Sequence, residues 1–412
     1  MYGAQLIKAL RRIFSRDGKF PLLSNPGSSD APHSTIPSHS IEFFGVGGEK
    51  MRAAGCDLVV DAKDLAVVGI TEIVSHLPKI WGLFHKLIAA ADQPRPDVAI
   101  VIDSPAFNWR VAREMKKRGV PVVYYVCPQF WAWRQGRVRL LRRYVDKALV
   151  IFPFEEKFYR DRGVDAEFVG HPLADLATPT ISREEYAADY GLDPARHWIT
   201  LMPGSRRKEV RMNLPEMLAA ARILGDKYQF LLPVAVTLDP DFVQQIVNDH
   251  KHAGAVATSE QTSPAQVRTS NSRIHLVRDS LPALVHSRAG IIASGTATVE
   301  AALMEVPFVM VYRVTALTYL LGRWTVKVPH FAMANLIAGK QIVPELVQKD
   351  FTAERVAGEV SRITEDGNQR AMMQSNLKEV RARLMGGLEG EHPAERTARR
   401  ILSMIGATQL EA

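Results

Sequence analysis

The segment WITLMPGSRRKEV, residues 198–210, decides the fold class of this chain. A short apolar run ends in a Pro-Gly turn, and a helix is expected to start near Ser205 and Arg206. The same order of strand, turn and helix recurs in VAIVIDSPAFNWR, residues 98–110, and in GIIASGTATVE, residues 290–300. Strands that alternate with amphipathic helices predict a parallel sheet covered on both faces, so we expect an α/β protein.

The alternation runs through two stretches of the chain, separated by HPLADLATPTIS, residues 171–182, which is rich in proline and small residues. We therefore expect two domains, residues 1–172 and 173–366, within the 412 residues. The helical patterns of residues 367–412 close the chain, and the architecture suggests that they pack back on the first domain. Residues 15–40 are crowded with Ser, Pro, Gly and His and read as a flexible insertion.

The composition narrows the classes of partner. Lys and Arg total 52 against 44 Asp and Glu, and the net charge of +8 suits nucleic acid, nucleotide phosphates or an acidic lipid surface. No RNA-binding or helix-turn-helix signature supports nucleic acid. Cys56 and Cys127 have no metal-ligand spacing, and the chain has neither an apolar run of about 18 residues nor the apolar core of a signal peptide. We therefore expect a cytoplasmic protein in a reducing compartment, without a disulfide framework.

The turn in residues 290–300 predicts an anion site. Its small residues Ser294, Gly295 and Thr296 let a ligand approach the backbone, and the first N–H groups of the following helix suit a diphosphate. Glu300 follows in that helix, where its carboxylate could accept hydrogen bonds from ribose hydroxyls. The alternative is that Ser294 or Thr296 only caps the helix and that Glu300 is solvated.

The turn in residues 198–210 repeats this pattern with Ser205 and Arg206. Arginine offers a planar fork for phosphate oxygens, and a bound anion would relieve the unfavourable position of a cation at a helix N-terminus. The alternative is an ordinary capped helix with a basic first turn.

Asp103 follows an apolar strand of the first half, at the edge where open α/β sheets bind ligands. A carboxylate there could act as general base on an acceptor hydroxyl. The competing interpretation is that Asp103 or Ser104 caps the helix that Pro105 begins, and the local pattern alone favours this cap.

Two aromatic segments remain. In residues 124–143, Gln129, Trp133 and Arg134 lie in a loop that leads into a basic helix, a pattern that suits sugar stacking, a membrane interface or nucleic acid; a core role for one tryptophan is equally open. Residues 65–90 are unusually apolar with interspersed lysines, as in a membrane-facing helix or a buried core helix.

In this order the motifs resemble lipid-A-disaccharide synthases, the family 19 glycosyltransferases of Gram-negative outer-membrane biosynthesis. The matching blocks run from Ile41 to about residue 348: GVGGEKMRAAGCD, DLAVVGITEI, PDVAIVIDSPAFN, YYVCPQFWAWRQGRV, FPFEEKFY, FVGHPLAD, LMPGSRRKEV, ASGTATVEAAL, PFVMVYR and PHFAMANLIAGKQIVPEL.

The resemblance implies the GT-B fold, two Rossmann-like domains with an interdomain cleft. It implies an inverting transfer of 2,3-diacylglucosamine from its UDP derivative to the 6-hydroxyl of 2,3-diacylglucosamine 1-phosphate, which yields the β-1,6 lipid A disaccharide 1-phosphate and UDP. One displacement suffices, so neither a covalent intermediate nor a metal or other cofactor is implied. The enzyme would work as a peripheral protein on the anionic cytoplasmic face of the inner membrane.

The resemblance also assigns roles to residues. Asp103 matches the family's essential aspartate, which favours the general base over the cap. Arg206 and the turn at Ser294 would hold the UDP diphosphate. The substrate-binding residues expected in all are Ser205, Arg206, Ser294, Gly295, Thr296, Glu300, Asn335, Gln129, Trp133 and Arg134.

One departure from the family concerns the start of the chain. Family members begin with an apolar strand and a Gly-Glu-x-Ser-Gly-Asp loop before the helix that here starts at Tyr2, so we expect a mis-assigned start or a truncated product. The competing hypotheses are a UDP-N-acetylglucosamine 2-epimerase or another GT-B enzyme acting on a UDP-sugar, and an inactive truncated chain that only binds UDP or membranes. An epimerase needs no acyl-binding surface, so residues 65–90 argue against it.

Overall fold

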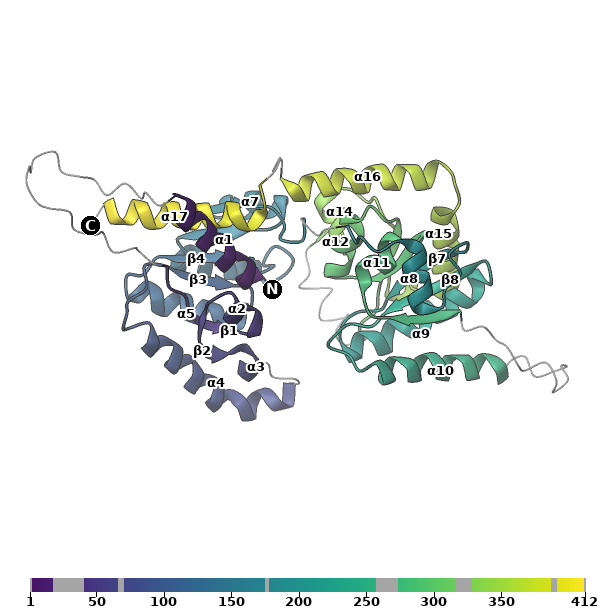
Figure 1. Cartoon of the computed structure of the whole chain (residues 1–412), viewed down its shortest axis with the longest axis horizontal. Helices are drawn as coiled ribbons and strands as arrows, with labels where there is room; N and C mark the ends of the chain where they lie inside the picture. Colours follow the sequence, from purple (N-terminus) through teal and green to yellow (C-terminus); the bar gives the residue numbers. More distant parts are fainter. Residues whose placement is uncertain are drawn as a thin grey trace, which may run out of the picture. The chain divides into compact units, whose positions relative to one another are not determined.

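The chain forms two compact units in a computed structural model (Figure 1). One comprises Met1–Pro172 with Gly386–Ala412, and the other comprises Leu173–Met385. The residues that the structure describes are 2–17, 41–65, 70–174, 178–256, 273–315, 328–386 and 391–410. Most of the predicted insertion, residues 18–40, lies outside them.

The first unit contains two parallel sheets among its described residues. The strands of the smaller sheet are β1 (Phe44–Gly47) and β2 (Asp57–Asp61). The larger sheet has the order β3-β4-β5-β6, with β3 (Ala99–Ile102), β4 (Val122–Tyr125), β5 (Lys147–Val150) and β6 (Ala166–Phe168). Val122, Tyr124 and Val150 are at most 1% exposed, as expected for parallel strands that helices cover on both faces.

Helices surround these sheets. They are α1 (Tyr2–Asp17), α2 (Glu49–Ala53), α3 (Ala62–Leu65), α4 (Ile70–Ala90), α5 (Pro105–Lys117), α6 (Val138–Tyr144), α7 (Pro153–Arg160) and α17 (Pro393–Leu410). Helix α1 lies along α17, the yellow C-terminal helix of Figure 1. The apolar stripe of α1, with Leu6 and Leu10 each 2% exposed, is buried, and Arg12 pairs with Glu395 at 2.5 Å.

The described part of the second unit holds one six-stranded parallel sheet. Its strands are β7 (His197–Met202), β8 (Tyr228–Pro233), β9 (Ile274–Val277), β10 (Ala289–Ala293), β11 (Phe308–Tyr312) and β12 (Glu345–Val347). The order β9-β8-β7-β10-β11-β12 reverses direction between β7 and β10. In a doubly wound sheet of this order, the carboxyl ends of the two strands at the reversal frame the usual ligand crevice.

The helices of this unit are α8 (Arg183–Tyr190), α9 (Arg207–Leu224), α10 (Pro240–Val256), α11 (Ser280–Val285), α12 (Thr296–Leu303), α14 (Met333–Ala338), α15 (Ala353–Thr364) and α16 (Asn368–Met385). Of residues 367–412, α16 therefore belongs to the second unit and α17 to the first. The parallel sheets confirm the predicted α/β class.

Candidate functional site

Asp103 and Ser104 form a strained junction between β3 and α5. Their φ angles are 49° and 42°, in the left-handed region that residues other than glycine seldom adopt. Both residues are exposed, and the side chain of Ser104 makes no capping bond at the start of α5. The carboxylate of Asp103 has no hydrogen bond or ion pair with the described part of the chain. The capping arrangement is therefore absent at this junction, and the carboxylate is available to a ligand.

Two side chains hold the backbone of this junction. The Asn108 amide donates to the carbonyl oxygens of Ile102 and Asp103 at 2.8 and 2.7 Å. The Tyr124 hydroxyl donates to the carbonyl of Asp103 at 2.7 Å, and burial raises the pKa of Tyr124 far above its usual value, so the hydroxyl keeps its proton. A strained backbone persists where surrounding groups fix it in this way. Sequence reasoning did not single out Asn108, whose only signal was an asparagine in the first turns of the helix.

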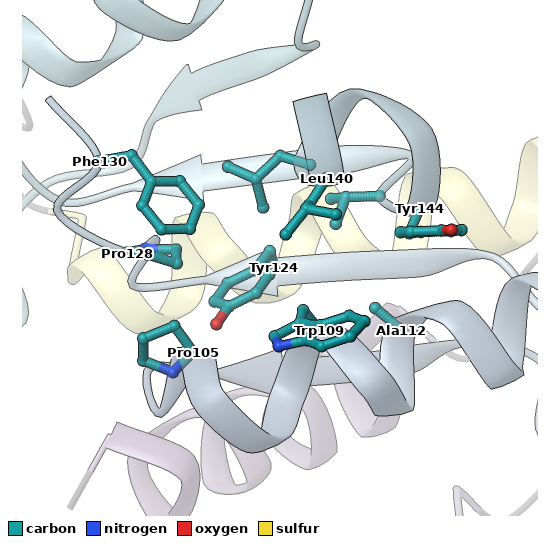
Figure 2. A pocket seen from close by; sticks show the side chains of 10 residues that line it. Pro105, Trp109, Ala112, Tyr124, Pro128, Phe130, Leu140 and Tyr144 are labelled. Carbon is teal, nitrogen blue, oxygen red and sulfur yellow. The ribbon is translucent and has the colours of Figure 1, made fainter. Parts of the chain in front are cut away.

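An apolar pocket adjoins this junction (Figure 2). Tyr124 lies in its middle with the hydroxyl toward Pro105. Trp109 from α5 and Phe130 from the loop after β4 form other parts of its lining. Tyr124 is thus 1% exposed, and its hydroxyl donates to the carbonyl of Asp103 from one side of this pocket.

The loop after β4 lies at the same edge of the sheet as Asp103, because Ile102 pairs with Tyr125. In this loop Trp131 is buried, whereas Trp133 is 44% exposed with the Arg134 guanidinium 4.4 Å from its ring centroid. Trp131 therefore takes the core role that the sequence left open. Three predicted contact residues of this loop are exposed: Gln129, Trp133 and Arg134.

A buried carboxylate anchors this loop. Glu155 is 1% exposed and accepts hydrogen bonds from the Trp131 indole at 2.8 Å and from the backbone N–H groups of Ile151 and Phe152 at 3.2 and 3.0 Å. Burial raises the pKa of Glu155 to about 7, although these donors lower it. Glu155 thus fixes the base of the loop without facing solvent, a role that sequence reasoning missed.

Two predicted anion-binding turns of the second unit are neighbours. Met202 at the end of β7 pairs with Ile292 near the end of β10. The turn at Ser205 and the turn at Ser294 therefore lie next to each other at the point where the strand order reverses. This long-range pairing brings together segments that are about 90 residues apart in the sequence.

Glu209 supplies a carboxylate to the first of these turns. It accepts from the backbone N–H groups of Ser205 and Arg206 at 3.1 and 3.3 Å, and Arg206 Nη1 donates to it at 2.7 Å. The turn passes close to this carboxylate at Gly204, whose φ is 119° and where an added Cβ would lie 2.6 Å from Glu209 Oε2. The Arg206 side chain is 81% exposed. The cationic helix start is therefore compensated from within the chain, and sequence reasoning overlooked Glu209.

The second turn is free of side-chain caps. Gly295, with φ 142°, occupies the cap position of α12, and the Ser294 hydroxyl instead donates to the carbonyl of Phe331 at 3.0 Å. Thr296 begins α12 and is exposed. Glu300 is partly buried, which raises its pKa, and it accepts a hydrogen bond from Ser280 at 3.3 Å. The side chains of Ser294 and Thr296 therefore do not cap α12, and Glu300 is not fully solvated.

Asn335 occupies a different environment from the one predicted. It has no exposed surface, and its amide donates to Val343 O and Glu345 Oε1 at 3.0 and 2.7 Å. Its oxygen accepts from Ile342 N and Val343 N at 2.8 and 2.9 Å. The resemblance implied a substrate contact for Asn335; in this structure its side chain is fully engaged by these four hydrogen bonds, so a substrate contact of the side chain would require breaking one of them.

The described residues contain no cluster of three or more His, Cys, Asp or Glu side chains that could hold a metal ion. Within the same residues, none of the helices has both the length and the apolar character needed to cross a bilayer. Residues 66–69 and the side chains of residues 70–77, which belong to the apolar segment 65–90, lie outside this description. Farther along α4, Phe84 is buried in the core and Trp81 is 57% exposed.

Comparison with known proteins places the chain in a family. Residues 30–392 match the family model described as lipid-A-disaccharide synthetase. The chain belongs to this family. The lipid-A-disaccharide synthase of Koribacter versatilis is 50% identical over 404 residues, 98% of this chain and 95% of the relative. That of Acidobacterium capsulatum is 47% identical over 386 residues, 93% of this chain and 88% of the relative.

Solved structures share the fold of the family member described here. The calicheamicin glycosyltransferase CalG4 aligns with a TM-score of 0.55 and 15% identity, over 98% of this chain and 95% of its own. A UDP-GlcNAc 2-epimerase from Neisseria meningitidis bound to UDP-GlcNAc aligns with a TM-score of 0.51 and 12% identity, over 90% of this chain and 100% of its own. This likeness confirms the predicted GT-B fold class, while the cleft between the domains stays a prediction.

Proposed function

We propose that this member of the lipid-A-disaccharide synthase family transfers 2,3-diacylglucosamine from its UDP derivative to the 6-hydroxyl of 2,3-diacylglucosamine 1-phosphate. The observation that carries the proposal is the Asp103 junction, where a carboxylate without internal partners is exposed on a backbone that Asn108 and Tyr124 hold. A base presented in this way can accept the proton of an attacking hydroxyl, which general acid–base catalysis requires.

The reaction needs a site for the departing diphosphate. In our proposal the adjacent turns at Arg206 and Ser294 bind it, with the free N–H groups of α12 and the Arg206 guanidinium as donors. Glu209 occupies the first turn in the free protein, so diphosphate binding exchanges this carboxylate for phosphate oxygens. Glu300, beside Ser280, would accept from the ribose hydroxyls.

The chemical step is a single displacement. The acceptor oxygen bonds to the anomeric carbon as its proton moves to Asp103, and the bond from that carbon to the UDP oxygen breaks. Negative charge develops on the diphosphate, and in our proposal Arg206 and the N-terminus of α12 stabilise it. Inversion of the anomeric centre follows from attack opposite the leaving group.

Turnover of both acylated substrates tests the proposal. We expect UDP release that requires the donor and the acceptor together, with a disaccharide 1-phosphate as product by mass spectrometry. An epimerase would instead change the donor without any acceptor, and an inactive chain would release no UDP. Either of these results would exclude the proposed transfer.

We also propose that the basic segment 134–143 docks the enzyme on an anionic membrane as a peripheral protein. Its five arginines are exposed, and two of them, Arg134 and Arg143, lie over the rings of the adjacent Trp133 and Tyr144. Among the described residues, none of the five forms an ion pair with a carboxylate: Arg134, Arg137, Arg139, Arg142 and Arg143. Unpaired arginines of this kind gain about 1 kcal/mol each near anionic lipid.

Removing three of these charges is expected to weaken vesicle binding. The triple variant Arg137→Gln, Arg139→Gln, Arg142→Gln should bind phosphatidylglycerol-containing vesicles about 10²-fold more weakly, since about 3 kcal/mol of attraction is lost. Co-sedimentation measures this. The matched control removes the same charge from arginines that are already paired, Arg355, Arg362 and Arg399. Equal losses in both variants would show that net charge, and not this segment, drives docking.

A further inference from the structure

A second basic feature, the arginine pocket, lies where β7 and β10 begin in the second unit. It has a volume of about 330 Å³, and Arg183, Arg196, Arg288 and Arg370 line it together with two histidines. Among the described residues that line it there is no Asp or Glu. The predicted diphosphate turn follows the opposite end of β7, and six strand residues at about 3.3 Å each separate the two by roughly 20 Å. The pocket is therefore distinct from the candidate donor site.

Backbone carbonyls fix Arg183 in this pocket. Its guanidinium donates to the carbonyls of Pro194 and Arg196 at 2.9 and 2.6 Å, and to that of His286. It also lies 3.7 Å from the ring centroid of the buried Trp198. These partners orient the fork but carry no negative charge, and no carboxylate of the described chain pairs with it. Three of its five N–H donors are used, so two stay available.

Arg370 is held in the same manner and is more deeply buried. It is 9% exposed and donates to the carbonyls of Arg288 and Ile363 at 2.7 and 2.8 Å. Burial and the nearby Arg288 charge lower the pKa of Arg370. Two exposed carboxylates outside the lining pair with the other two arginines, Asp366 with Arg288 and Asp193 with Arg196. Four guanidinium groups of the pocket thus stand against two solvated carboxylates.

We propose that the arginine pocket binds a phosphate-bearing anion, either a soluble phosphate ester or a phospholipid headgroup. Guanidinium forks from α8, the start of β10 and α16 converge on one cavity, and their spare N–H groups match the oxygens of a phosphate. The backbone has already ordered two of these forks, so binding costs little side-chain entropy. The anion supplies the negative charge that the lining residues lack.

Equilibrium dialysis with inorganic phosphate tests the pocket. The protein carries Arg206→Gln throughout, so that the guanidinium of the predicted diphosphate site does not contribute; phosphate bound at the α12 turn would be insensitive to the pocket substitutions. We expect one phosphate per chain, with affinity reduced about tenfold or more by Arg196→Gln and by Arg370→Gln. Arg196 is exposed, so its variant keeps the fold even if Arg370→Gln lowers the melting temperature. Arg355→Gln, outside the pocket, is the matched control and should leave phosphate binding unchanged.

Competition identifies the source of the phosphate. Stronger displacement by short-chain phosphatidic acid than by glycerol 3-phosphate indicates a lipid headgroup, and the reverse indicates a soluble ester; both results support the site. The absence of bound phosphate in the Arg206→Gln protein would overturn the proposal. So would an affinity that neither Arg196→Gln nor Arg370→Gln changes. Arg196→Gln should leave UDP release unaffected, since the pocket lies away from the candidate donor turns.

Discussion

Replacing Asp103 by asparagine is expected to reduce the kcat of UDP release by about 10²–10⁴-fold, the range that a positioned general base contributes. Asparagine tolerates the left-handed conformation almost as well as aspartate, so the φ of 49° at this position can persist. The carboxylate is exposed and has no partner in the described chain, so its removal breaks no internal contact. The substitution therefore isolates the loss of a proton acceptor. Steady-state kinetics and UDP binding by calorimetry measure the two consequences.

The matched control for this variant precedes the same strand that Asp103 follows. Asp97 is exposed near the other end of β3, and Asp97→Asn changes the net charge equally. We expect wild-type turnover from that variant and unchanged UDP affinity from both. Turnover that survives in Asp103→Asn would contradict the assignment of the base. A parallel loss of UDP binding would place Asp103 in the donor site instead.

The sequence predicted the features that depend on local pattern, but not those that depend on long-range packing. The turns at Ser205 and Ser294 were recognised because a strand, small residues and a helix start are adjacent in the chain. Their proximity depends on the pairing of Met202 with Ile292, which no local pattern contains. The burial of Trp131 is likewise accompanied by a hydrogen bond to Glu155, a residue more than 20 positions away.

The roles that the sequence missed are mostly those of side chains that form hydrogen bonds with main-chain groups. Asn335 belongs to a family motif, which suggested a ligand contact, yet three of its four hydrogen bonds go to the loop before β12 and the fourth goes to Glu345 at the start of β12. Glu209 reads as an ordinary helical glutamate, yet it closes the turn that is proposed to bind diphosphate. Hydrogen bonds to main-chain groups produce no periodic pattern in the sequence. Such roles can therefore be recognised only in the three-dimensional structure.

Asn108 gives the second large expected effect. Asn108→Ala removes two hydrogen bonds that hold the carbonyls of Ile102 and Asp103. A left-handed residue costs about 1–3 kcal/mol, and without this support the junction should relax and displace the carboxylate. We expect kcat to fall about 10- to 10²-fold, which corresponds to about 1.4–2.8 kcal/mol, while the KM for the UDP-sugar stays unchanged. Tyr124→Phe removes only one bond to the same carbonyl and should have a smaller effect.

A double-mutant cycle separates positioning from general destabilisation. If Asn108 acts only through Asp103, then Asn108→Ala should lower kcat in the wild type but have almost no further effect in Asp103→Asn, because the base it positions is already gone. A merely structural role would instead lower the melting temperature and reduce turnover by the same factor in both backgrounds. Additive losses in kcat would therefore contradict the assignment of Asn108 as a positioning residue, even if the single variant is slow.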